Sequence, residues 1–79
     1  MKFVYMATKG GEDPTLASIP LHLAVNGSLE VGHDVAIVLA GHAAEIITGD
    51  NPRLLEGIGV PPLRELLAKA REHAVPVYV

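Results

Sequence analysis

The chain has 79 residues, a net charge of −3 and no cysteine, and 49% of its residues are hydrophobic against 19% charged. A chain of this length forms one small domain, and without cysteine it contains neither a disulfide nor a zinc site built on thiolates. The acidic charge argues against nucleic acid and anionic membranes as partners, and no apolar run approaches the roughly 20 residues that span a bilayer. We therefore expect a single cytoplasmic domain over residues 1–79, with part of its apolar surface covered by other subunits or by a further part of the same protein.

The first third of the chain predicts a strand, a loop and a long helix. Residues 2–7 form an apolar run with the composition of a buried strand, and a glycine-containing loop over residues 8–13 follows it. Asp13 is suited to accept hydrogen bonds from the free N–H groups of a helix, and Pro14 suits the first helical position. We predict a helix over residues 14–31, kinked where it contains Pro20 and stopped by a glycine at position 32.

The remaining residues predict two more strands and a second long helix. Residues 34–39 have the continuous β-branched pattern of a strand covered on both faces, and residues 77–79 begin a third strand. The last helix is amphipathic and places Glu65 and Lys69 as a supporting ion pair one turn apart. The other expected segments are a short helix over 43–48, a turn at 50–52, a loop over 53–62 with one helical turn at 54–56, and the last helix from Pro62 to Pro76.

The alternation of strands and helices predicts an α/β fold with a parallel sheet flanked by helices and joined by right-handed crossovers. Three strands are few for a sheet of this kind, which usually has about four to six. We therefore expect that the chain is incomplete after its third strand, or that a neighbour completes it.

The loop over residues 8–13 is the first place to look for function, because sites in parallel sheets collect where the strands reach their carboxyl ends. A lysine, two glycines and a helix N-terminus favour an anion such as phosphate, but the loop lacks the spacing of known phosphate-binding motifs, and its acidic residues would repel phosphate. The other interpretations are a tight turn that only joins strand to helix, and a site for a small ligand or a partner protein. The candidate ligand-binding residues are Thr8, Lys9, Gly10, Gly11 and Asp13.

His42 follows the second strand, three residues before Glu45, and is expected near the first loop. The two residues could share a metal ion or act as an acid–base pair, but the pattern is short and is also typical of an exposed, hydrogen-bonded pair. We assign His42 to a ligand site formed by residues 8–13 and 40–45, and we expect no metal and no cofactor. No set of residues resembling a catalytic triad can be assembled, so no catalytic residue is assigned.

The helix predicted over residues 14–31 has more apolar surface than one sheet can cover. Its polar residues Ser18, His22, Asn26 and Glu30 are spaced four apart, and they trace a stripe of roughly 120° that leaves an apolar arc of roughly 240°. Burying each large aliphatic side chain contributes about 1.5–3 kcal/mol. We therefore predict a homo-oligomer with this helix in the interface.

Several stretches in this order and spacing resemble the DsrE/DsrF-like family of sulfur-relay and related proteins. The resemblance covers the whole chain and is carried by residues 3–14, 17–24, 30–35, 37–44, 62–67 and 75–79. It implies a three-layer α/β/α fold in a flavodoxin-like arrangement, with a parallel sheet of about five strands. It also implies assembly into trimers or hexamers, and in some members a persulfide carried on a cysteine after the strand that corresponds to residues 75–79.

The chain departs from this pattern because it has no cysteine, and sulfur relay needs a thiolate nucleophile. The leading hypothesis is therefore a DsrE-like oligomeric module related to persulfide sulfurtransferases but lacking the acceptor cysteine. One alternative is a non-enzymatic module of the same fold that binds a small ligand or a protein. A second alternative is a metal-dependent enzyme that uses His42 and Glu45.

Overall fold

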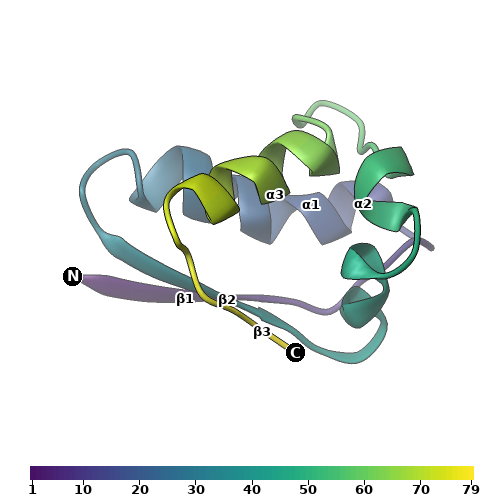
Figure 1. Ribbon diagram of the computed structural model, residues 1–79, viewed down its shortest axis with the longest axis horizontal. Helices are drawn as coiled ribbons and strands as arrows, with labels where there is room; N and C mark the ends of the chain where they lie inside the picture. Colours follow the sequence, from purple (N-terminus) through teal and green to yellow (C-terminus); the bar gives the residue numbers. More distant parts are fainter.

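The computed structural model describes all 79 residues, which form a three-stranded parallel sheet and a layer of helices (Figure 1). The strands are β1 (Lys2–Ala7), β2 (Asp34–Leu39) and β3 (Val77–Tyr78), in the spatial order β1-β2-β3. The pairing of β1 with β2 is parallel along the full length of both strands, and β3 joins β2 through two residues. The predicted α/β class, the parallel sheet and the bounds of the first two strands are therefore confirmed.

The first helix begins as predicted but ends earlier and less regularly. Helix α1 (Pro14–Leu23) starts at Pro14, and the Asp13 side chain accepts a hydrogen bond from the backbone N–H of Leu16 at 3.1 Å. The helix runs through Pro20 and continues as one π-helical segment, η1 (Ala24–Ser28), where the sequence predicted regular helix to residue 31. Gly32 then adopts a φ of 88°, a left-handed conformation that glycine adopts without steric cost.

The later helices keep the predicted order with shifted bounds. A 3-10 helix, η2 (Gly41–Ile47), replaces the short helix expected over 43–48. The single helical turn, α2 (Asn51–Leu54), lies before the predicted position of 54–56, with a proline at its first turn. Helix α3 (Leu63–Glu72) follows the predicted loop. None of these helices has the length and apolar character that crossing a bilayer requires.

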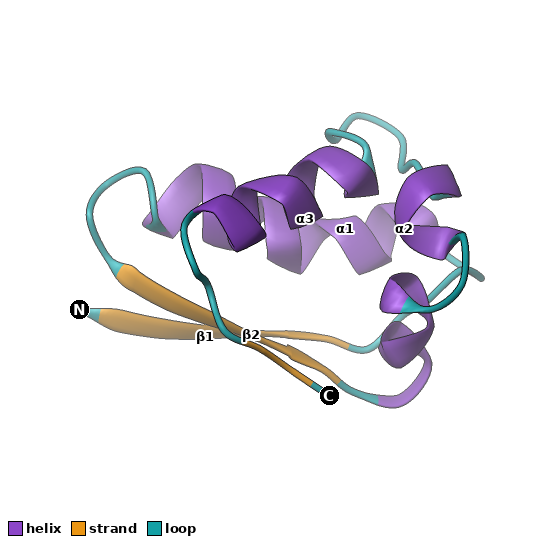
Figure 2. Ribbon diagram, in the orientation of Figure 1, coloured by secondary structure: helices purple, strands orange, loops and turns teal.

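The order of the strands explains why the helices gather on one face of the sheet. Both crossovers step in the same direction, from β1 to β2 and from β2 to β3, and two crossovers of the same hand place their helices on the same side. Figure 2 shows α1, η1 and α3 together over one face, with η2 and α2 at the carboxyl end of the strands. These residues therefore form two layers, whereas the family resemblance implies three.

The core lies between the sheet and this single helical layer. Side chains at alternate positions of β1 and β2 point toward the helices, and Ile37 in the central strand is fully buried. Leu21 and Val25 of the first helical stretch are also fully buried within the chain. The other large side chains that complete this core are Leu39, Ile46, Leu63 and Leu66.

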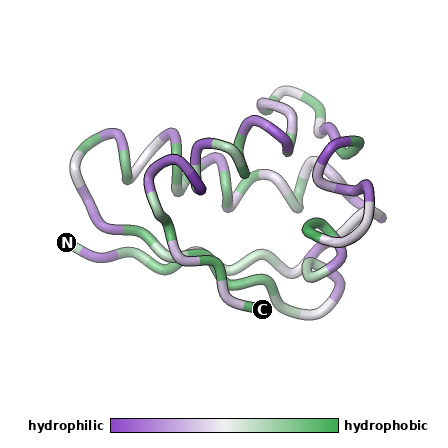
Figure 3. Tube along the Cα trace, viewed as in Figure 1, coloured by the Kyte–Doolittle hydropathy of each residue, from purple (hydrophilic) through white to green (hydrophobic).

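The opposite face of the sheet has no covering layer. Val4 and Met6 of β1 are 61% and 58% exposed, and Tyr78 of β3 is 58% exposed. The register places Met6 beside Val38 and Val38 beside Tyr78, so these side chains form one apolar surface across the three strands. The trace in Figure 3 shows how apolar these strands are. The sequence predicted a buried strand over residues 2–7, and this is wrong for the side chains on this face, because burial alternates along β1.

Candidate functional site

The two predicted site loops meet at the carboxyl end of the sheet. The backbone N–H of Ala40 donates to the carbonyl oxygen of Ala7 at 2.9 Å, which ties the ends of β2 and β1 together. Beyond this bond, the buried Gly10 packs against the backbone of His42. The expectation that residues 8–13 and 40–45 share one edge of a parallel sheet is therefore confirmed.

The N–H groups that would bind phosphate in this loop are occupied by carboxylates of the chain itself. The backbone N–H of Gly10 donates to a carboxylate oxygen of Glu12, and that of Leu16 donates to Asp13 at the helix N-terminus. An incoming phosphate would have to displace two negative charges from these donors. The geometry therefore favours a self-contained turn over a phosphate-binding loop.

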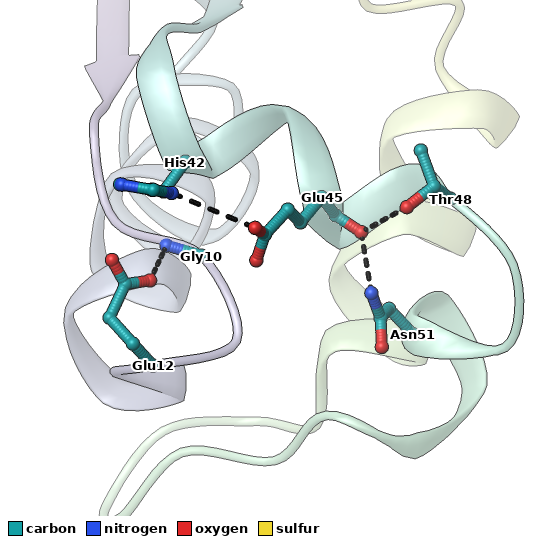
Figure 4. Close-up of polar contacts among 6 residues, drawn as sticks. All are labelled: Gly10, Glu12, His42, Glu45, Thr48 and Asn51. Atoms are coloured by element: carbon teal, nitrogen blue, oxygen red, sulfur yellow. Dashed lines mark hydrogen bonds and ion pairs between the residues drawn. The ribbon is translucent and has the colours of Figure 1, made fainter.

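His42 and Glu45 form an exposed pair on η2. The His42 Nδ1 atom lies 3.6 Å from a carboxylate oxygen of Glu45, and both side chains are more than half exposed (Figure 4). The backbone carbonyl of Glu45 accepts hydrogen bonds from the side chains of Thr48 and Asn51, each at 2.8 Å, and these bonds hold the end of η2. No group of three or more potential ligand side chains gathers in the structure, so this pair has no third residue with which to hold a metal.

The remaining predicted site residues lie on the surface of the same edge. Thr8, Lys9 and Gly11 are exposed, and Asp13 is half-buried because it caps α1. Neither of the two hollows in the structure is lined by these residues or by His42. The two loops thus pack on each other, and neither hollow lies between them.

Hydroxyl groups near the start of α1 have structural partners. Ser18 donates to the carbonyl oxygen of Pro14 at 2.7 Å, a local bond within the first turn of the helix. Thr15 instead accepts a hydrogen bond from the backbone N–H of Ile58 at 2.9 Å. This long-range bond fixes the loop between α2 and α3 against the first helix.

Sequence reasoning did not find the larger hollow, which lies between η2, α2 and α3. Its lining contains Arg53 from α2 and both Arg64 and Arg71 from α3. Arg64 and Arg71 are seven residues apart, so they lie two turns apart on one side of α3. This spacing was the only signal of the hollow in the sequence. It indicates a site only once the fold shows that α2 brings Arg53 beside the two arginines of α3.

Comparison of the chain with protein-family models, with curated proteins and with solved structures gives no match. The function must therefore be argued from the residues and their geometry.

Proposed function

We propose that the chain is an oligomeric module of the DsrE-like kind, which assembles through the bare face of its parallel sheet. The observation that carries this proposal is the exposed apolar surface formed by Val4, Met6, Val38 and Tyr78. Parallel sheets are almost always covered on both faces. A second copy of the chain supplies the missing cover in this proposal.

The apolar surface of the sheet supports assembly more strongly than the first helix does. Leu21 and Val25, which belong to the helical stretch predicted to form the interface, are fully buried within the chain. Leu16 and Leu23 are each 49% exposed, so the helix retains only part of the surface that the sequence assigned to it. We propose the sheet face as the main contact and these two leucines as a secondary one.

The proposed role is binding, not sulfur transfer by this chain. A persulfide is carried on a cysteine thiolate, and the chain contains no cysteine. Within a DsrE-like assembly, this chain would contribute fold and interface while any thiol came from a different polypeptide segment.

Sedimentation of the purified chain at micromolar concentration tests the proposal. We expect the unaltered chain to sediment as an oligomer. The double substitution Val4→Thr with Met6→Thr places β-branched threonine, which suits a strand, at both positions but removes apolar surface, and it should weaken association by at least about tenfold.

The matched control is Ile58→Thr, which removes a similar apolar group from a loop position that is 88% exposed. It should leave the oligomeric state unchanged. A monomer at the same concentration with a full complement of secondary structure would overturn the proposal.

A further inference from the structure

The larger hollow of the structure is lined by both apolar and charged side chains. It has a volume of about 410 Å³ and lies where η2 and α2 meet α3. Ile47, Pro52 and Leu67 contribute apolar surface, and Arg53, Arg64 and Arg71 contribute guanidinium groups. The volume falls within the range of small-molecule sites.

The gathering of arginines in this hollow stands out against the composition of the chain. The chain has only three arginines, all of them line this hollow, and its net charge is −3. None of the three lysines lines it. Arginine presents a planar fork of donors that matches carboxylate and phosphate oxygens, which lysine cannot do.

The carboxylates nearby leave this cluster positively charged. Arg53 lies 3.4 Å from Asp50, and Arg64 lies 3.6 Å from Glu56. The side chains of both pairs are more than half exposed, so each ion pair is weak, and an anionic ligand can replace the carboxylate as the partner of the arginine. Arg71 makes no ion pair, so three guanidinium groups face two paired carboxylates.

We propose that this hollow binds a small amphiphilic anion, with a phosphate or carboxylate head held by the guanidinium groups of Arg64 and Arg71. The apolar part of the ligand packs on Ile47 and Leu67. The head and the apolar part both take part in binding, because the guanidinium groups and the apolar side chains line the same hollow. This site is separate from the bare face of the sheet, so its test is independent of the proposed assembly.

Titration followed by NMR chemical shifts at low ionic strength tests the site with three probes, namely phenyl phosphate, benzoate and inorganic phosphate. We expect phenyl phosphate or benzoate to shift the resonances of residues 47–71, and the tighter of the two identifies the preferred head group. Inorganic phosphate should bind at least about tenfold more weakly than phenyl phosphate, because it has no apolar part to pack on Ile47 and Leu67.

Substitutions then separate recognition from general charge. Arg71→Gln should weaken binding of the better probe by about tenfold or more, and Arg64→Lys should weaken it although the charge is kept. Lys2→Gln, which removes the same charge from β1, should leave the affinity unchanged. All of these positions are exposed, and spectra of the free variants report whether the fold is retained.

Three results would each overturn the proposal. The first is the absence of shifts in residues 47–71 with all three probes. The second is an equal loss of affinity in Lys2→Gln and Arg71→Gln, which would indicate charge attraction without a site. The third is equal affinity for inorganic phosphate and phenyl phosphate, which would show that an apolar group on the ligand contributes nothing to binding.

Discussion

Gly10 lies directly against the backbone carbonyl of His42, with no room between them for a side chain. A Cβ atom on Gly10 would lie under 3.0 Å from that carbonyl oxygen, and 2.9 Å from a carboxylate oxygen of Glu45. The glutamate side chain can move, but the carbonyl belongs to the 3-10 helix that follows β2. The close approach of the two loops therefore depends on a glycine at this position.

We predict that Gly10→Ala destabilises the protein by about 1–3 kcal/mol, because the methyl group forces the two loops apart. The measurement is the free energy of unfolding from urea denaturation. Gly27→Ala is the matched control, since nothing lies within 4 Å of the added methyl group and the residue belongs to the π-helical segment η1. This control should be neutral or stabilising by up to about 1 kcal/mol. Equal stability of both variants would show that the contact at Gly10 is loose in solution.

Local signals in the sequence were sufficient to predict the elements whose ends are marked by characteristic residues. The apolar runs of β1 and β2 end where glycines or polar residues begin, and Asp13 with Pro14 marks the start of α1 by supplying its missing acceptor. The end of that helical stretch was harder to predict, because nothing in the local sequence indicates the change to π-helix at Ala24.

Features that depend on strand order could not be predicted. The sequence does not indicate that β2 is central, and with β2 central both crossovers place their helices on one face. Val4 and Met6 are exposed for this reason, although their strand has the composition of a buried one. The candidate sites differ in the same way. The shared edge of the two loops could be predicted from the parallel pairing of β1 and β2. The arginine hollow could not, because it depends on the position of α2 beside α3.

The interpretation of His42 and Glu45 as metal ligands is tested by adding zinc. Catalytic zinc sites use three protein ligands, and this pair has no third residue near it. We expect excess zinc to leave the melting temperature unchanged, because a ligand stabilises a protein only in proportion to its occupancy of the native state. A clear rise that His42→Ala abolishes would contradict this expectation and support the metal-dependent enzyme.

Lys69 bridges α3 and the end of the first helical stretch instead of pairing with Glu65 on its own helix. Its ammonium group donates to the carboxylate of Glu30, and also to the side-chain oxygen of Asn26 at 2.8 Å. Asn26 in turn contacts His22 at 3.0 Å, so residues that the sequence placed on one polar stripe form a connected network. The predicted pair of Glu65 with Lys69 is therefore wrong, because a partner on another helix takes the lysine.

The hydrogen bond from Lys69 and the charge of its ammonium group lower the pKa of Glu30 from its ordinary value of 4.5, and His73 contributes in the same direction. Because the pKa is lower in the folded state, the pair adds stability above the ordinary pKa, and this stability is lost as the pH falls through the folded value. Glu30 is exposed, so we expect a small effect that high salt weakens.

Titration of the Glu30 carboxyl carbon by NMR measures this pKa directly. We predict that Lys69→Met raises the pKa of Glu30 toward its ordinary value, because it removes both the donor and the charge. His73→Gln is the control, and it should raise the pKa of Glu30 less, since His73 acts only through its charge. The free energy of unfolding, measured as a function of pH, should show the same effect. As the pH falls below 4.5, Glu30→Gln should lose less stability than the unaltered chain. If the Glu30 titration is the same in the unaltered chain and in Lys69→Met, the bridge between the two helices does not persist in solution.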